Sequence, residues 1–316
     1  MHPAYSVIVF TTLSGAGYGL LAWLAGAAIT SPIARDATFG FVGMFVALLL
    51  VGAGLLSSTA HLGRPERAWR AFSQWRTSWL SREGVLAVAT FVPAGLLGIL
   101  WVFLGGAPAV LRAPVAILLV ILALATVWST GMIYQSLPTI RAWHRPIVTP
   151  VYLALSIASG GVLMQTLLAL FGYGSWRVLW GTLLALALGA AMKLTYWRAI
   201  DTDEKPFSAG DATGLRALGE VRVLEQPHTT ANYVMREMGY AVGRKHASRL
   251  RMIALAAGFV APALALVLAA VSPGWLAITL LLIGAVAMMV GMFVERWLFF
   301  AEAQHVVTLY YGAQRA

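Results

Sequence analysis

The sequence predicts an all-α integral membrane protein with eight transmembrane helices. Hydrophobic residues make up 60% of the 316 residues and charged residues only 11%, whereas a soluble domain keeps about a quarter of its residues charged. Apolar runs close to the ~20 residues that cross a bilayer recur along the sequence. Because a backbone in lipid must satisfy its own hydrogen bonds, we expect each run to be a helix.

Proline or glycine marks several ends of these runs, and the spans follow in order. The predicted spans are 8–30, 40–60, 84–106, 114–134, 150–171, 178–199, 251–271 and 275–299. We expect one integral-membrane domain over residues 1–316, packed as two four-helix bundles. The first run has no basic region before it, which predicts a retained span rather than a cleaved signal. Its small residues predict close helix packing; they are Ser14, Gly15, Gly17 and Gly19.

Lysine and arginine are unevenly shared between the two sides of the predicted membrane protein. An even number of spans puts both termini on one side, with the links after spans two, four and six. That side holds nineteen of the 22 Lys and Arg residues, and the other side holds Arg35, Arg112 and Arg177. The positive-inside rule then places both termini and those links in the cytoplasm. This bias explains the net charge of +10, so we expect no nucleic-acid partner.

Two cytoplasmic links stand out by composition and length. The link 61–83 reads HLGRPERAWRAFSQWRTSWLSRE, and its aromatic side chains are spaced three, three and four apart. Trp69, Phe72, Trp75 and Trp79 would then share one face of an interfacial helix at the lipid headgroups. The link 200–250 exceeds what a turn requires. Its mixed charges favour a docking surface for a soluble partner, and a solvated loop is the alternative.

Several cofactors and functions find little support in the sequence. The sequence contains no cysteine, so we expect no disulfide and no Cys-ligated iron–sulfur cluster in this protein. All six histidines lie at helix ends, in links or near termini, whereas a bis-histidine heme needs them inside facing helices, so we expect no heme. Polar groups within the spans are few, such as Gln165, Lys193 and Glu295. A transporter or channel without a redox role stays open as the alternative of another class.

Two groups of polar residues are candidates for chemistry. His61 ends the second span and Glu83 opens the third, so both lie at the cytoplasmic membrane surface. An imidazole beside a carboxylate suits a quinone site, where one group bonds a quinone oxygen and the other moves a proton. A structural His–Glu pair is the alternative. Glu295, Glu302 and His305 would share one face if the last helix continued, which predicts a second polar cluster or a solvated helix end.

The same segments resemble a known family. HLGRPERAW…SWLSRE resembles the HLG-x-P-x-R-A-[FW]…LS-x-E segment of the dimethyl sulfoxide reductase anchor subunits, the eight-span subunits of molybdopterin–iron–sulfur oxidoreductases. Four further segments extend the resemblance over nearly the whole sequence. They are HPAYSVIVFTTLSGAGYG, IYQSLPTIRAWHRPIVTP, EQPHTTANYVMREMGYAVGRKHA and ERWLFFAEAQHVVTLYY.

The resemblance implies partners, a cofactor and site residues. It implies a bacterial inner-membrane subunit that anchors a four-cluster iron–sulfur subunit and a molybdopterin catalytic subunit. Such an anchor holds no metal, converts no substrate itself and exchanges electrons with ubiquinone or menaquinone. Carried over by position, His61 and Glu83 are the quinone-associated pair, with Gly63 and Arg67 in the same loop.

The side of the membrane bears on the direction of electron flow. Respiratory dimethyl sulfoxide reductases keep their catalytic subunits outside, on the face where this loop lies. Here the loop is arginine-rich, and the positive-inside rule places it inside. That pattern resembles the branch with cytoplasmic catalytic subunits, the membrane-bound sulfite-oxidising enzyme, in which sulfite electrons pass to quinone. The alternative is a dimethyl sulfoxide reductase-type anchor that oxidises quinol, because a docked partner can demand a basic surface on either side.

Overall fold

Eight membrane-spanning helices build the molecule, as predicted. The computed structural model describes residues 3–60, 62–104, 107–203, 207–222, 224–225, 230, 232–238 and 242–313. Within these ranges eight helices are long and apolar enough to cross a membrane. They are α1 Tyr5–Thr30, α2 Ala37–Thr59, α3 Trp79–Gly98 with its extension Ile99–Phe103, α4 Ala109–Gln135, α5 Val148–Leu170, α6 Trp176–Asp201, α10 Ala247–Leu255 joined to α11 Ala261–Ala270, and α12 Gly274–Ala301.

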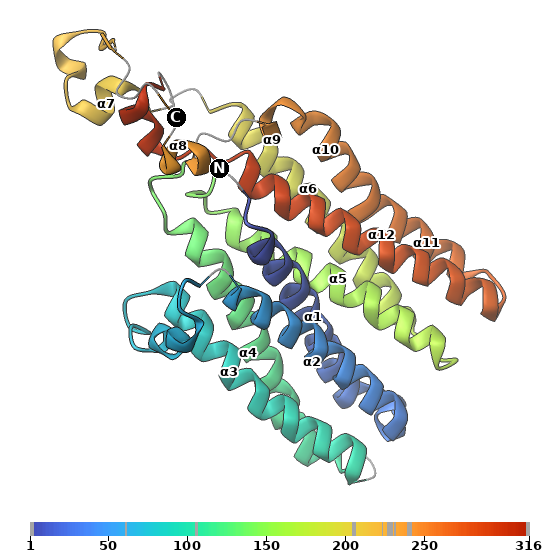
Figure 1. Ribbon diagram of the computed structural model, residues 1–316. Helices are drawn as coiled ribbons and strands as arrows, with labels where there is room; N and C mark the ends of the chain where they lie inside the picture. The colour runs from blue at the N-terminus through green and yellow to red at the C-terminus, as the bar shows by residue number, and fades with distance from the viewer. Residues whose placement is uncertain are drawn as a thin grey trace.

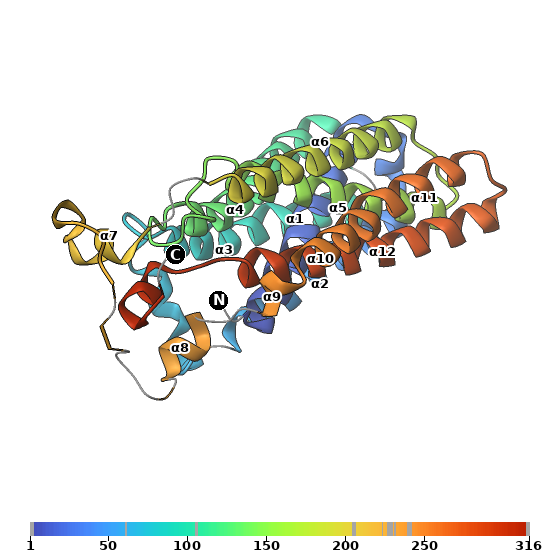
Figure 2. The same ribbon diagram turned by 90° about the horizontal axis from the view of Figure 1, so that it is seen from above.

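The helices lie side by side in one elongated bundle (Figures 1 and 2). Both ends of the protein lie at one end of this bundle, together with the short helices α7 Ala209–Thr213, α8 Tyr233–Met238 and α9 Val242–Lys245. We call this end the terminal face. It carries the links after α2, α4 and α6, in agreement with the predicted even number of spans.

The expected two groups of four helices are present and are joined along their length. In the first group α1 packs on α2 and α4, and α3 packs on α4; in the second, α5 packs on α6 and α12, and α11 packs on α12. The helices α1, α4 and α12 also bring the groups together, since α1 and α4 both contact α5 and α1 contacts α12. The centre of the bundle is therefore the meeting point of α1, α4, α5 and α12.

Glycine permits the closest of these contacts. A Cβ atom at Gly19 of α1 would lie 1.8 Å from the carbonyl oxygen of Ser156 on α5. A Cβ atom at Gly160 of α5 would lie 2.2 Å from the carbonyl carbon of Gly19. Gly17 faces the backbone of α2 in the same way. Gly17 and Gly19 of the first span thus serve close helix packing, as the sequence predicts, whereas a Cβ atom at Gly15 would meet no atom within 4 Å.

Two of the described helices contain a π-helical turn, which adds one residue to a regular helix. In the extension of α3, Ile99–Phe103, the turn buries Trp101, whose Nε1 donates a hydrogen bond to the carbonyl of Asp36 at 3.1 Å. Between α10 and α11 the turn spans Ala256–Val260 and precedes Pro262. There Gly258 lies against Gly291 of α12, with no room for a Cβ atom on Gly291.

The link before α3 does not form the predicted amphipathic helix. It contains a 3-10 helix, Pro65–Phe72, then turns through residues 73–77, and α3 begins at Trp79. The four aromatic side chains therefore do not share a face of one helix. Arg82 explains the difference, because its Nε and Nη2 donate to the carbonyls of Trp75 and Arg76 at 3.0 and 2.6 Å and hold the turn closed.

Candidate functional site

Glu83 is a buried carboxylate one turn into α3 from the terminal face. Its side chain is 4% exposed, although it lies in a membrane-spanning helix. The hydroxyl of Thr130, on α4, donates a hydrogen bond to Glu83 Oε1. No ion pair to Glu83 is present among the described residues. A carboxylate held in an apolar setting by a neutral partner is suited to taking up and releasing a proton.

The loop before α3 is held against the same helix turn. Arg82 lies over the ring of Trp79, 4.2 Å from its centroid, and closes the turn described above. A Cβ atom at Gly84 would lie 3.1 Å from the Phe72 ring, so the absence of a side chain lets Phe72 pack beside Glu83. Trp69 and Trp75 are exposed. The loop therefore presents aromatic rings outward while its base lies on α3.

Of the other residues of the predicted quinone site, two lie in described segments and one does not. Gly63 and Arg67 are described and exposed, in the loop and its 3-10 helix. His61 lies outside the described residues, so its predicted approach to Glu83 stays a prediction. α2 ends at Thr59 and α3 begins at Trp79, both at the terminal face.

A second polar group, the buried ion triad, consists of Lys193, Glu295 and Arg296. Lys193 Nζ lies 2.5 Å from Glu295 Oε1, and Arg296 Nε donates to Glu295 Oε2 at 2.6 Å. All three side chains are at most 4% exposed. Aromatic rings surround the cations: the Arg296 guanidinium lies 3.9 Å from the Tyr152 centroid, and Lys193 Nζ lies 4.1 Å from that of Tyr196. The triad joins α6 to α12 inside the bundle.

His305 does not share a helical face with Glu295 and Glu302, contrary to the predicted arrangement. α12 ends at Ala301, Glu302 is its C-cap, and His305 begins a 3-10 helix, Val306–Tyr311. Glu302 pairs instead with Arg251 of α10, at 2.8 Å. Burial raises the pKa of Glu302, and Arg251 opposes that rise.

Glu302 and Arg251 line a basic cavity of about 330 Å³ on the terminal face, which we call the arginine cavity. Its charged lining comes from four arginines and three acids: Arg141, Arg145, Arg244, Arg251, Asp201, Asp203 and Glu302. Asp203 binds both Arg141 and Arg145, and Arg251 binds both Asp201 and Glu302. The lining carries one more positive than negative charge, which suits an acidic group of a docked protein.

His305 makes the C-terminal segment sensitive to acid. Its Nδ1 accepts a hydrogen bond from the Val307 amide at 3.0 Å, which requires the neutral ring. Burial lowers the pKa of His305 from its ordinary value of about 6.5. The stabilisation is therefore present above about pH 6.5 and is lost as the pH falls through the lowered folded value.

We expect the amides of the 3-10 helix Val306–Tyr311 to lose protection from hydrogen exchange between pH 7.5 and pH 5. Exchange rates corrected for intrinsic pH dependence measure this loss. A His305→Phe variant has no acceptor and should show the low protection at both pH values. Equal protection of the wild-type helix at pH 7.5 and pH 5 would contradict the role of His305.

Three basic residues are buried in the helix bundle. Lys193 and Arg296 are buried in the triad, and Arg112 is buried in α4, where its Nη1 donates to the Ala34 carbonyl at 3.2 Å. Most of the other described Lys and Arg residues gather at the terminal face, and Arg35 and Arg177 lie at the opposite end of the bundle. The asymmetry that predicts the orientation therefore does not depend on these three.

Comparison with known families identifies the family of the protein. Residues 1–312 match the family model described as DMSO reductase anchor subunit (DmsC). The protein belongs to this family. It is a multi-pass membrane anchor of the type found in DMSO reductase and sulfite dehydrogenase complexes.

Two relatives of this anchor subunit differ in how much of the sequence they match. A sulfite dehydrogenase subunit of Allochromatium vinosum is 36% identical, over 98% of this protein and 99% of the relative. An anaerobic dimethyl sulfoxide reductase chain of Escherichia coli is 32% identical, over 43% of this protein and 47% of the relative. The similarity to the sulfite dehydrogenase subunit thus extends from end to end.

Thr130 is the residue of the anchor subunit's candidate site that sequence reasoning missed. A threonine in a transmembrane helix is common, because its hydroxyl bonds its own helix backbone. Only the packing of α3 on α4 brings Thr130 to Glu83. The pairing of Lys193 with Glu295 was missed for the same reason, although both residues stood out as ionisable groups within spans.

Proposed function

We propose that this anchor subunit passes electrons between a docked iron–sulfur subunit and membrane quinone, in a complex whose molybdopterin subunit oxidises sulfite. The end-to-end similarity to a sulfite dehydrogenase subunit supports this proposal most strongly. Sulfite and water give sulfate, two protons and two electrons at the catalytic partner. The electrons cross the clusters of the iron–sulfur subunit, four by family resemblance, and reduce quinone with two protons.

The quinone site of the proposal is the first turn of α3. Glu83 supplies the buried carboxyl group there, and His61 is proposed to supply the imidazole beside it. Leu80 lies in this same turn and is 56% exposed. A quinone that enters from lipid would thus meet apolar side chains first and the carboxyl group of Glu83 at its head.

Glu83 suits the reaction because reduction of quinone needs protons. A carboxylic acid within hydrogen-bond reach of a quinone oxygen gives its proton as the electrons arrive. Gly63 and Arg67, in the exposed loop, are proposed to shape the headgroup end of the same site. Quinone, when bound, supplies the two-electron chemistry, and this protein supplies the binding surface and the proton.

Docking is proposed at the terminal face, which we place in the cytoplasm from the distribution of Lys and Arg. The arginine cavity and the exposed loop with Trp69 and Trp75 support a partner of acidic and partly apolar surface. The short helices α7, α8 and α9, which belong to the described parts of residues 200–250, lie at this same face and support a docking role for the segment. One docked partner would then lie close to Glu83 and to the arginine cavity.

Isolation of the complex tests this function. The tagged anchor, extracted from membranes in mild detergent, should retain an iron–sulfur and a molybdopterin subunit, and the complex should reduce a soluble quinone when sulfite is added. Quinol-dependent reduction of dimethyl sulfoxide without sulfite oxidation would reverse the proposed direction. Solute movement by the purified protein in liposomes, with no oxidoreductase bound, would replace the proposal by a transporter.

A further inference from the structure

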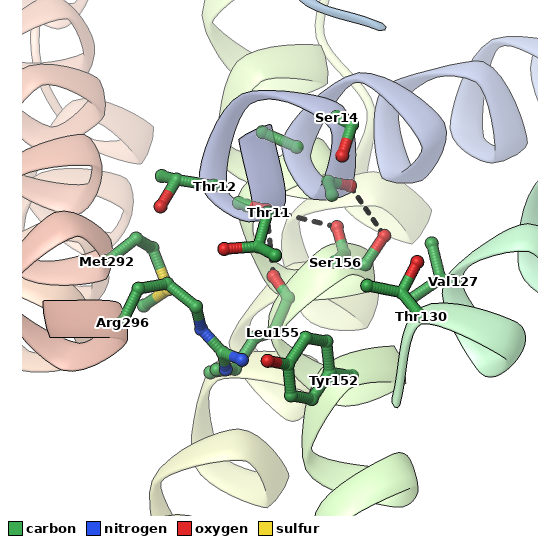
Figure 3. A pocket seen from close by; sticks show the side chains of 13 residues that line it. Thr11, Thr12, Ser14, Val127, Thr130, Tyr152, Leu155, Ser156, Met292 and Arg296 are labelled. Carbon is green, nitrogen blue, oxygen red and sulfur yellow. Dashed lines mark hydrogen bonds between the residues drawn. The ribbon is translucent and has the colours of Figure 1, made fainter. Parts of the chain in front are cut away.

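A small polar cavity lies at the meeting point of α1, α4, α5 and α12 (Figure 3). Hydroxyl groups and one guanidinium face it, so we call it the hydroxyl cavity. Its polar lining consists of Thr11, Thr12, Ser14, Thr130, Tyr152, Ser156, Ser159 and Arg296. Its volume, about 30 Å³, has room for water and is too small for a quinone headgroup.

Two lining groups indicate that water fills the hydroxyl cavity. Thr12 Oγ1 and Arg296 Nη1 are buried, and neither has a hydrogen-bond partner in the part of the protein that the structure describes. A buried polar atom without a partner costs about 1–3 kcal/mol, and ordered water is the usual way to satisfy it. Both atoms belong to side chains that line the hydroxyl cavity, one from α1 and the other from α12.

Thr130 connects this cavity to Glu83. It lines the cavity from α4, and its hydroxyl donates to Glu83 Oε1. The Thr130 hydroxyl oxygen also lies 3.1 Å from the Thr126 carbonyl, a second acceptor on the preceding turn. When Glu83 carries a proton, it can donate to Thr130 while Thr130 donates to Thr126. Thr130 therefore keeps its contacts with Glu83 and Thr126 in both protonation states of the carboxyl group.

We propose that Glu83 exchanges protons with water in the hydroxyl cavity through the hydroxyl of Thr130. This inference rests on the proposed quinone function and specifies its proton path. A proton leaves the Glu83 carboxyl group for the reduced quinone oxygen. Its replacement comes from the terminal face through cavity water and Thr130, which gives one proton and receives another. The quinone thus receives protons from inside the bundle rather than along the lipid surface.

The depth of the cavity suits a short path. Thr11 is the seventh residue of α1, so it lies about 9 Å along the helix from the terminal face. Two or three waters span such a distance. The charge of Glu83 acts on tyrosines of three helices, Tyr18 of α1, Tyr134 of α4 and Tyr152 of α5. Arg296 of α12 acts on Tyr134 and Tyr152.

The test is Thr130→Val, which keeps the shape of the side chain and removes the hydroxyl. In the intact complex we expect sulfite-dependent quinone reduction to fall about tenfold, a modest share of what proton transfer contributes to catalysis. The rate ratio between H₂O and D₂O should rise and the pH profile should change. Thr130→Ser should restore all three. Sulfite oxidation with ferricyanide, which takes electrons from the partners, should stay normal.

Thr90→Val is the matched control, because it removes a buried threonine hydroxyl from α3 two turns beyond Glu83. It should leave the rate and the isotope ratio at wild-type values. If Thr130→Val does not assemble, Thr12→Val takes its place, since it removes a water partner of the cavity and should slow turnover several-fold.

The outcomes separate the path from the function. Wild-type rate and isotope ratio in Thr130→Val, or in Thr12→Val if that variant is used, would overturn the path. If Glu83→Gln were inactive in that case, the proposed function would stand without the proton path. Full activity of Glu83→Gln would contradict both the proposed role of Glu83 in quinone reduction and the proton path.

Discussion

Glu83→Gln should abolish sulfite-dependent quinone reduction and leave the complex assembled. The amide has the size of the carboxyl group and still accepts a hydrogen bond from Thr130, but it cannot take up and release a proton. Because general acid–base catalysis contributes about 10²–10⁴-fold, we expect a loss of at least about 100-fold. Turnover of a soluble quinone by the purified complex measures this loss, and the retained subunits report assembly. His61→Ala should produce a loss of the same kind.

Glu66→Gln provides the control, because Glu66 is an exposed carboxylate in the same loop. It should reduce quinone at the wild-type rate. A quinone analogue should compete with the substrate in wild type and in Glu66→Gln. Normal quinone-linked turnover in both Glu83→Gln and His61→Ala would show that the quinone site lies elsewhere.

Glu295→Leu should destabilise the protein more than other single changes in the bundle. The substitution leaves Lys193 and Arg296 buried in an apolar interior without their shared carboxylate. Removal of one partner of a buried ion pair costs about 3–5 kcal/mol. Thermal unfolding in detergent, followed by tryptophan fluorescence, should show a clear fall in the midpoint, and the yield from membranes should drop.

A second substitution separates the charge effect from packing. Lys193→Met in the Glu295→Leu background returns the buried group to the wild-type net charge of one positive. It should therefore recover part of the lost stability, and the non-additivity measures the coupling of the two residues. Glu220→Leu, which removes the exposed partner of Arg222, should have no measurable effect. A Glu295→Leu midpoint equal to that of wild type would contradict a stabilising triad.

The spans were predictable because the bilayer requires apolar side chains along the whole length of each run. Each predicted span overlaps an observed helix, and the ends differ by a few residues, as at 84–106 against Trp79–Phe103. The family resemblance likewise pointed to Glu83, and its burial in α3 suits the proposed role.

The predictions that failed depend on contacts between distant segments. The loop before α3 is held by Arg82, which bonds two backbone carbonyls and so competes with a regular helix. Glu302 turns to Arg251, fifty-one positions earlier in the sequence. Thr130 and Lys193 acquire their partners only through the rotation of α4 and α6 in the bundle. Helical spacing within one segment carries no information on that rotation.

The π-helical turn Ala256–Val260 sets the direction in which Arg251 points. An extra residue in a helix turns everything before it by about 100° relative to everything after it. Loss of one residue from this turn would leave a regular apolar span of nearly the same length. Arg251 would then rotate away from Asp201 and Glu302, and the arginine cavity would lose both ion pairs of Arg251. Hydrophobicity thus determines that this segment spans the membrane. The number of residues in the helix determines separately the direction in which Arg251 points.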